Sequence, residues 1–161
     1  MFIGWLRSRP KLEVIMNSFK SVVVALTLLA SPVFAVDGSQ CGLTDQKDDS
    51  WKQTKLISLS RADEEKVSNL DTKTKQQIII AANYFGTDFG ATGKFKNTMD
   101  AVNFMRGNSE AGDMAVIYYR VNGERFTEVI HYPGGNPVGV IFATGSRTII
   151  AENGDDSIIC K

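Results

Sequence analysis

The chain has 161 residues, with 18 basic and 18 acidic side chains, one His and two Cys. This length fits one compact domain, and a hydrophobic content of 43% with mixed charges is that of a globular protein, not a disordered one. The balanced charge disfavours nucleic-acid binding, which needs a clustered positive excess. One His and two Cys leave few ligands for a transition-metal site, so the sequence predicts no metal and no other cofactor.

The N-terminal segment has the pattern of a targeting sequence. Residues 21–36 carry no charge, follow Lys20, and contain Val33-Phe34-Ala35 near their end. A basic start, an apolar core and small residues at the cleavage site are typical of a secretory signal peptide. We predict cleavage after Ala35, so that residues 36–161 form a single globular domain. An uncleaved anchor is the alternative, although the uncharged run is shorter than the roughly 20 residues of a membrane-spanning helix.

Two further details concern the leader. Met16 opens a compact basic n-region, so we expect translation to start there, with a true long n-region that includes residues 1–15 as the alternative. Lipid attachment at Cys41 is disfavoured, because Asp37 and Gln40 stand where small or apolar residues are needed. The sequence thus predicts an exported protein, periplasmic or extracellular, without a membrane anchor after cleavage.

Removal of the leader also changes the charge of the protein. Residues 1–35 hold four of the 18 basic and one of the 18 acidic side chains, so 14 basic and 17 acidic side chains remain, a net charge of −3. A mildly negative protein is expected to be soluble and to disfavour anionic partners.

Both cysteines lie in the predicted mature domain, near its two ends. An even number of cysteines in an exported chain indicates a disulfide, and Cys41 with Cys160 allows one intramolecular pairing. A redox pair or an intermolecular bridge is the alternative, but redox pairs usually have the Cys-x-x-Cys spacing that is absent here. We therefore predict a structural disulfide that ties the two termini together.

The first half of the mature domain predicts a short strand followed by helices. Residues 52–59 partly alternate between polar and apolar and fit a strand. The run Ser60-Arg61-Ala62-Asp63 has the form of a capping box and predicts a helix that begins at Ser60.

Two more helices are expected before the polypeptide changes its periodicity. Residues 72–85 have apolar side chains at helical spacing, with Asp71 as the N-cap and Gly86 at the C-cap position. Residues 97–106 fit a short helix capped by Asn97. This part of the chain therefore contributes two to three helices.

From Met114 onward the hydrophobic period is two, as in strands. Asn122-Gly123 fits a two-residue type I′ hairpin turn, and the other strands are separated by Pro133-Gly134-Gly135-Asn136, Gly145-Ser146 and Asn153-Gly154. The sequence predicts an α+β fold in which the helices pack on a C-terminal antiparallel meander of about five strands. The predicted strands are residues 114–121, 124–132, 137–144, 147–152 and 157–160.

The predicted pairing of residues 114–121 with residues 124–132 identifies the candidate catalytic residues. A turn centred on Asn122-Gly123 pairs Ile117 with Glu128 on an otherwise apolar face, and Arg120 with Arg125 on the other face. A carboxylate in apolar surroundings is costly to bury unless it is paired or protonated, so Glu128 is either a functional acid, an ion-pair partner or a rim residue. His131, the one histidine, is a candidate general base, but strand alternation puts it on the face opposite Glu128, so the two do not form a dyad.

Motifs for other chemistry are absent or incomplete. The Gly-rich segment at residues 85–96 lacks the Ser or Thr that follows the lysine of a P-loop, because Phe95 stands there. It is therefore predicted to be a helix–helix connection. Acidic clusters at residues 45–49 and 155–156 lack the EF-hand pattern and are expected to be solvated turns. Aromatic and basic side chains in this connection and in the hairpins are the candidate binding residues: Phe89, Lys94, Tyr118 and Tyr132.

Taken together, these features predict a small exported protein without catalytic activity that binds a protein, a peptide or an envelope component. An inhibitor, an immunity protein or an accessory domain would each have this size and composition. The alternative is a small secreted hydrolase that uses His131 or Glu128.

Overall fold

The computed structural model describes residues 41–88, 95–154 and 157–161. They belong to the second of two units into which the chain divides, Met1–Ala35 and Val36–Lys161. The predicted leader and the candidate residues Phe89 and Lys94 lie outside the described residues. The elements are β1 (Trp51–Ser58), α1 (Glu64–Ser68), α2 (Thr72–Asp88), α3 (Thr98–Gly107), β2 (Met114–Val121), β3 (Glu124–His131), a 3₁₀ turn (Pro133–Gly135), β4 (Val138–Ala143), β5 (Ile149–Gly154) and β6 (Ser157–Cys160).

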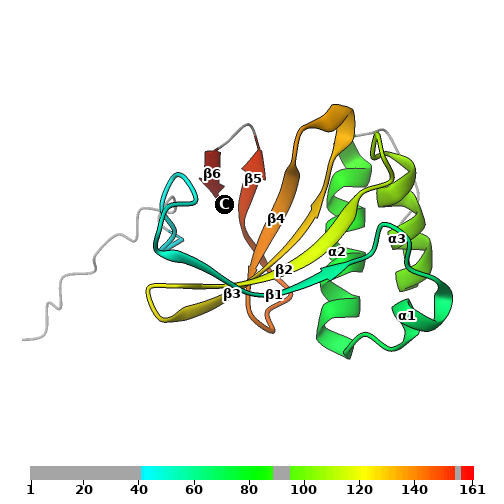
Figure 1. Ribbon diagram of the computed structural model, residues 1–161, viewed down its shortest axis with the longest axis horizontal. Coiled ribbons are helices and arrows are strands. Elements are labelled where there is room, and N and C mark those ends of the chain that lie inside the picture. The colour runs from blue at the N-terminus through cyan, green and yellow to red at the C-terminus, as the bar shows by residue number, and fades with distance from the viewer. Residues whose placement is uncertain (1–40, 89–94, 155–156) are drawn as a thin grey trace, which may run out of the picture. The chain divides into compact units, whose positions relative to one another are not determined.

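The strands form one antiparallel sheet in the order β1-β2-β3-β4-β5-β6, which is also their order along the chain (Figure 1). This confirms the α+β class and the antiparallel sheet. The sheet has six strands rather than about five, because the strand that precedes the helices pairs with β2 and becomes an edge of the sheet. The helices are thus inserted between the first two strands.

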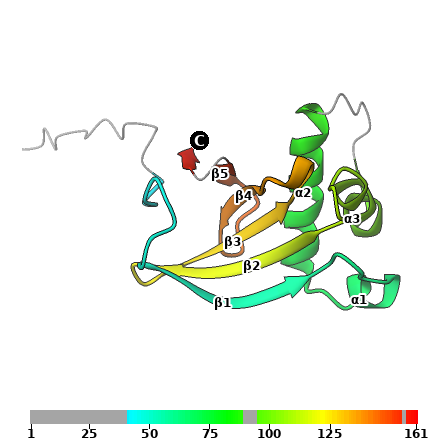
Figure 2. The same cartoon turned by 45° about the horizontal axis from the view of Figure 1, so that its top comes forward.

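One face of the sheet packs on the helices (Figure 2). Val116, Val129 and Val140 stand side by side on three neighbouring strands and contact the apolar faces of the helices. From α2, Ile78 and Phe85 enter this core, whose members are almost fully buried. Burial of this continuous apolar surface is the main force that holds the helices on the sheet.

The other face carries a second apolar core, covered by the segment of residues 41–50, which we call the strap. Ile117, Ile130 and Ile141 lie in this core, and Cys41 and Leu43 of the strap pack against it. The strap lies beside β6, where Ile158 donates its backbone N–H to the carbonyl oxygen of Asp45 at 2.6 Å. Two chain segments that are far apart in sequence are thereby joined.

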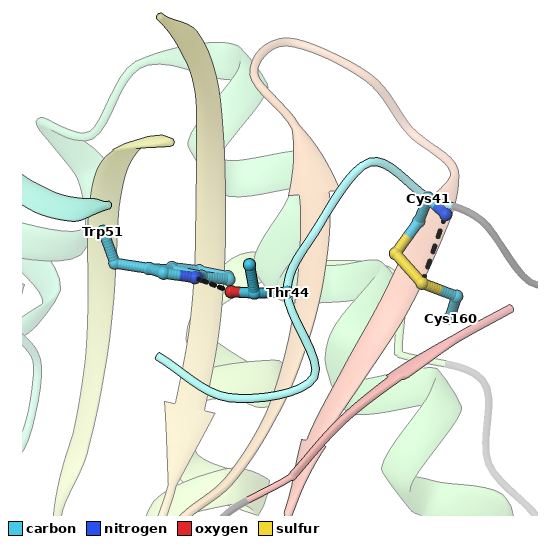
Figure 3. The surroundings of a disulfide bond; sticks show 4 residues. All are labelled: Cys41, Thr44, Trp51 and Cys160. Carbon is cyan, nitrogen blue, oxygen red and sulfur yellow. Dashed lines mark hydrogen bonds between the residues drawn. A yellow bond between two sulfur atoms is a disulfide. The ribbon is translucent and has the colours of Figure 1, made fainter. Parts of the chain in front are cut away.

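The predicted disulfide between Cys41 and Cys160 is present (Figure 3). It fixes one end of the strap to β6, and the Sγ of Cys160 also accepts the backbone N–H of Cys41 at 3.2 Å. The indole N–H of Trp51, the first residue of β1, donates to Thr44 Oγ1 in the strap at 2.8 Å (Figure 3). The strap is therefore held to β6 by the disulfide and to the start of β1 by this hydrogen bond.

The predicted N-caps of the second and third helices are found, but that of the first is wrong. Asp71 accepts the backbone N–H of Thr74, and Asn97 accepts that of Asp100. The first helix begins at Glu64 with Asp63 as its N-cap, because the Ser60 hydroxyl instead accepts the backbone N–H of Met114. Ser60 thus satisfies the backbone N–H of the first residue of β2.

Two predicted boundaries based on glycine are also wrong. Gly86 does not end its helix, since α2 continues to Asp88. Asn153-Gly154 is not a turn, because both residues pair with β4 and β6 inside the sheet. At residues 153–154, pairing with two neighbouring strands overrides the local preference of Asn-Gly for turns.

Candidate functional site

Glu128 lies in the middle of β3 and is fully buried in the core beneath the strap. The hairpin register predicted from the sequence is correct, since Glu128 pairs with Ile117 and Ile130 with Ala115. On its other side Glu128 pairs with Ile141 of β4. A carboxylate in this position needs a compensating charge from another part of the chain.

The compensating charge comes from Lys47 in the strap. Its ammonium donates to both carboxylate oxygens of Glu128, at 2.9 and 2.7 Å. The side-chain amide of Asn153 in β5 donates a further hydrogen bond to Oε1 at 2.6 Å. The carboxylate therefore accepts three hydrogen bonds from two side chains, which satisfy the buried acid.

Aromatic rings position the Lys47 ammonium. It lies 4.9 Å from the ring centre of Tyr119 and 5.8 Å from that of Trp51, and it donates to the Tyr119 hydroxyl at 3.2 Å. The two rings meet edge to face, with their centres 5.2 Å apart. Cation–π attraction and the ion pair therefore act on the same ammonium group.

Gly139 in β4 makes room for the carboxylate. A Cβ atom at this position would lie 2.7 Å from Oε1 of Glu128, closer than real contacts allow. Sequence reasoning missed Lys47, Asn153 and Gly139. The pattern of β3 showed that Glu128 needs a cation, but the partner is 81 positions away.

A pocket of about 570 Å³ lies in front of this ion pair. The pKa values of Tyr119 and Tyr132 are raised, chiefly by burial and next by the negative charge of Glu128. Both phenols are thus protonated at neutral pH, and the carboxylate stays behind Lys47 and Asn153 with no exposed surface. The pocket is lined by Gln46, Lys47, Ile117, Tyr119, Ile130, Tyr132, Pro137 and Asn153.

His131 lies on the opposite face of β3, inside the helix-facing core. It is fully buried, and its ring centre is 4.6 Å from that of Phe85 in α2. Burial disfavours the charged imidazolium and lowers the pKa of His131, against a smaller opposing effect of a backbone hydrogen bond with Met105. His131 and Glu128 are therefore not brought together.

Tyr118 belongs to a different site, near the end of the β2–β3 hairpin. Lys52 pairs with Arg120 across β1 and β2, and Arg120 pairs with Arg125 across β2 and β3. Because directly opposed residues share a face, three cations stand in one row across the sheet. Beside this row lies a pocket of about 360 Å³, here called the cationic pocket, lined by Thr54, Lys55, Tyr118, Tyr119, Arg120, Arg125 and Thr144.

The cations of this region have no carboxylate within ion-pair distance among the described residues, where the salt bridges are Lys47–Glu128 and Lys161–Glu152. Lys55 lies 5.5 Å from the ring centre of Tyr118. The Tyr118 hydroxyl contacts Thr74 Oγ1 at 2.5 Å, which orients the ring toward α2. Like charges opposite one another destabilise a sheet, so an anion beside them would be stabilising.

Lys55 acts electrostatically on Asp71, the N-cap of α2. The two hydrogen bonds from Thr74 lower the pKa of Asp71 most, and the charge of Lys55 lowers it further. Asp71 is thus ionised and caps α2, and the ion pairs of the described residues do not include the arginines of the cationic pocket.

The remaining candidates do not form a site in the described part of the chain. Asp48 accepts the backbone N–H and the hydroxyl of Ser50, which lowers its pKa and closes a local turn. Among the described residues no group of three metal-ligating side chains occurs. No helix in that part of the chain is long and apolar enough to cross a membrane.

Comparison with known proteins gives no relative. No protein-family model matches the chain. No curated protein and no solved structure matches it either.

Proposed function

We propose that the protein is a small exported binding or accessory protein, of the inhibitor, immunity or envelope-interaction kind, and that its cationic pocket holds an acidic segment of a partner protein. The observation that carries the proposal is the row of Lys52, Arg120 and Arg125 without an ion-pair partner among the described residues. Arginines present planar donor groups that suit carboxylates.

Export is part of the same proposal. It is supported by the leader pattern of residues 1–35 and by the disulfide, which is compatible with an oxidising compartment. The net charge of −3 expected for the mature chain does not oppose an acidic partner at this place, because electrostatic attraction at contact depends on the local charge within about 10 Å at 0.1 M salt.

A hydrolase that uses Glu128 or His131 is the second candidate. Its support is the pocket of about 570 Å³ in front of the Lys47–Glu128 ion pair. Against it stand the burial of both residues and their places on opposite faces of β3. If Glu128→Gln and His131→Gln, each correctly folded, abolish an activity found for the mature protein, the hydrolase takes precedence.

The binding proposal is tested with an oligoglutamate peptide and two double variants. Arg120→Gln/Arg125→Gln removes two charges from the pocket, and Arg61→Gln/Lys66→Gln removes the same charge from exposed positions before and within α1. We expect calorimetry to show salt-sensitive binding that weakens about tenfold in the first variant and stays unchanged in the second. Equal binding by both variants, or no saturable binding at low salt, would contradict the proposal.

A further inference from the structure

The strand beside the cationic pocket is an edge of the sheet. Within the described part of the chain, β1 pairs with β2 on one side and has no strand on its other side. It is eight residues long, and most of its side chains are exposed. The opposite edge, β6, has four residues and carries the disulfide. β1 is therefore the longer edge on which a further strand can pair.

The two faces of β1 differ in chemistry. Lys52 pairs with Arg120 and Lys55 with Tyr118, and the two lysines share one face because a β-bulge between Gln53 and Lys55 shifts the register by one residue. Leu56 pairs with Ile117 on the opposite face and is 51% exposed. A strand added to β1 would thus meet cations on one face and an apolar side chain on the other.

From this geometry we infer that the partner, beside the acidic segment in the cationic pocket, adds a β-strand along the outer edge of β1. Its carboxylates lie beside Lys52 and Lys55, and its apolar side chains lie beside Leu56. The inference rests on the proposed function and specifies the conformation and the sequence pattern of the ligand, which alternates acidic and apolar residues. Side chains of successive strand residues point to opposite faces, so this period of two follows from strand pairing.

Charge complementarity selects this occupant over a second copy of the chain. Cross-strand side chains lie about 5 Å apart, so carboxylates on an added strand are direct neighbours of the β1 lysines. Two β1 edges pairing with each other would instead line up lysines from both copies along one seam. Lysines on an edge strand oppose such self-association, and the same charges favour an acidic strand.

Three peptides with the same side chains separate strand addition from simple charge attraction. The first peptide has eight residues, matching β1, and alternates glutamate and valine. The second contains the same residues in two blocks, and the third is the alternating peptide N-methylated at alternate residues, which removes backbone donors. Binding to the mature domain is measured by calorimetry, and protection of β1 amides by hydrogen exchange.

The alternating peptide is expected to bind about tenfold more tightly than the other two and to slow amide exchange in β1. Equal binding of the alternating and blocked peptides without protection of β1 would overturn strand addition, while the oligoglutamate experiment would still support the cationic pocket. Protection of β1 in the absence of peptide, rising with protein concentration, would identify a second copy as the occupant and also overturn it.

A matched pair of variants tests the apolar half of the pattern. Leu56→Thr changes an exposed apolar residue on β1, and Ile159→Thr changes one on β6 that is 56% exposed. We expect Leu56→Thr to weaken the alternating peptide about fivefold and Ile159→Thr to leave it unchanged. Equal effects of the two variants would contradict the inferred placement of the ligand.

Discussion

Single charged residues in this protein depend on partners from distant segments. Glu128 is acceptable in an apolar core because Lys47 and Asn153 donate to it and because Gly139 leaves space for it. Removing one partner of such a pair leaves the other charge buried and uncompensated, which is more destabilising than removing both.

Replacement of Lys47 should therefore destabilise the fold strongly. We expect Lys47→Met to lower the free energy of unfolding by roughly 3 kcal/mol, because the Glu128 carboxylate keeps no counter-charge. The double variant Lys47→Met/Glu128→Gln should recover part of the loss. Urea unfolding measures both values, with Lys161→Met as the control, because both partners of its ion pair with Glu152 are partly exposed and such a pair is worth about 1 kcal/mol or less. Equal losses for Lys47→Met and Lys161→Met would show that the ion pair does not stabilise the core.

His131 should make the stability of the protein depend on pH. Burial holds its pKa below the ordinary value of 6.5, so the unfolded chain binds a proton more readily than the folded one. The contribution of neutral His131 to stability is therefore fully present above about pH 6.5 and is lost as the pH falls below that value. His131→Gln should flatten the change in melting temperature between about pH 7 and pH 5. An unchanged slope would assign the acid sensitivity to other groups.

At the scale of elements, the β2–β3 hairpin sets the register on which both pockets depend. Its turn residues Asn122 and Gly123 have φ values of 50° and 91°, as a type I′ turn requires. A shift of one residue would exchange the two faces of β3 and place Glu128 and His131 in each other's core. The helices are specified differently, by caps and apolar spacing, and tolerate errors of a residue or two at their ends.

A side chain at the hairpin turn should destabilise the whole sheet. Gly123→Ala forces a Cβ into a left-handed conformation, and we expect a loss of about 1–2 kcal/mol in the free energy of unfolding. Gly107→Ala is the matched control, since this exposed glycine in α3 has no positive φ and should gain up to about 1 kcal/mol. Thermal unfolding of both variants measures the two changes in stability. A neutral Gly123→Ala would mean that the turn does not fix the register.

At the scale of the whole described unit, the disulfide joins its two ends. Cys41 and Cys160 are 119 positions apart, so in the unfolded state the bond closes a loop over nearly all of the described part of the chain. The bond also keeps the strap, and with it Lys47, over the buried carboxylate. The disulfide and the Lys47–Glu128 ion pair therefore both depend on the position of the strap.

Loss of the disulfide should lower stability more than loss of an ordinary contact. The chain-entropy account gives up to about 4–5 kcal/mol for a loop of this length, and we expect Cys41→Ser/Cys160→Ser to approach it. Denaturant unfolding of this variant, beside the reduced wild type, measures the effect. Combined with Lys47→Met, the loss should be less than additive, because both changes release the strap. Strict additivity would argue that strap and disulfide act independently.

The sequence by itself determined the α+β class, the hairpin register and the pairing of the two cysteines. Each of these depends on local chemistry: alternation of apolar residues, a turn that requires positive φ, and a single possible partner. Arg120 facing Arg125 followed from the same register.

Only the tertiary structure decided which distant groups meet. Lys47 lies over Glu128, Asn153 belongs to a strand rather than a turn, and Lys52 completes the cation row because β1 joins the sheet beside β2. Such contacts depend on how the elements pack together, and no local pattern encodes a partner more than 60 positions away. The sequence could therefore show that Glu128 needs a cation, and only the fold could supply Lys47.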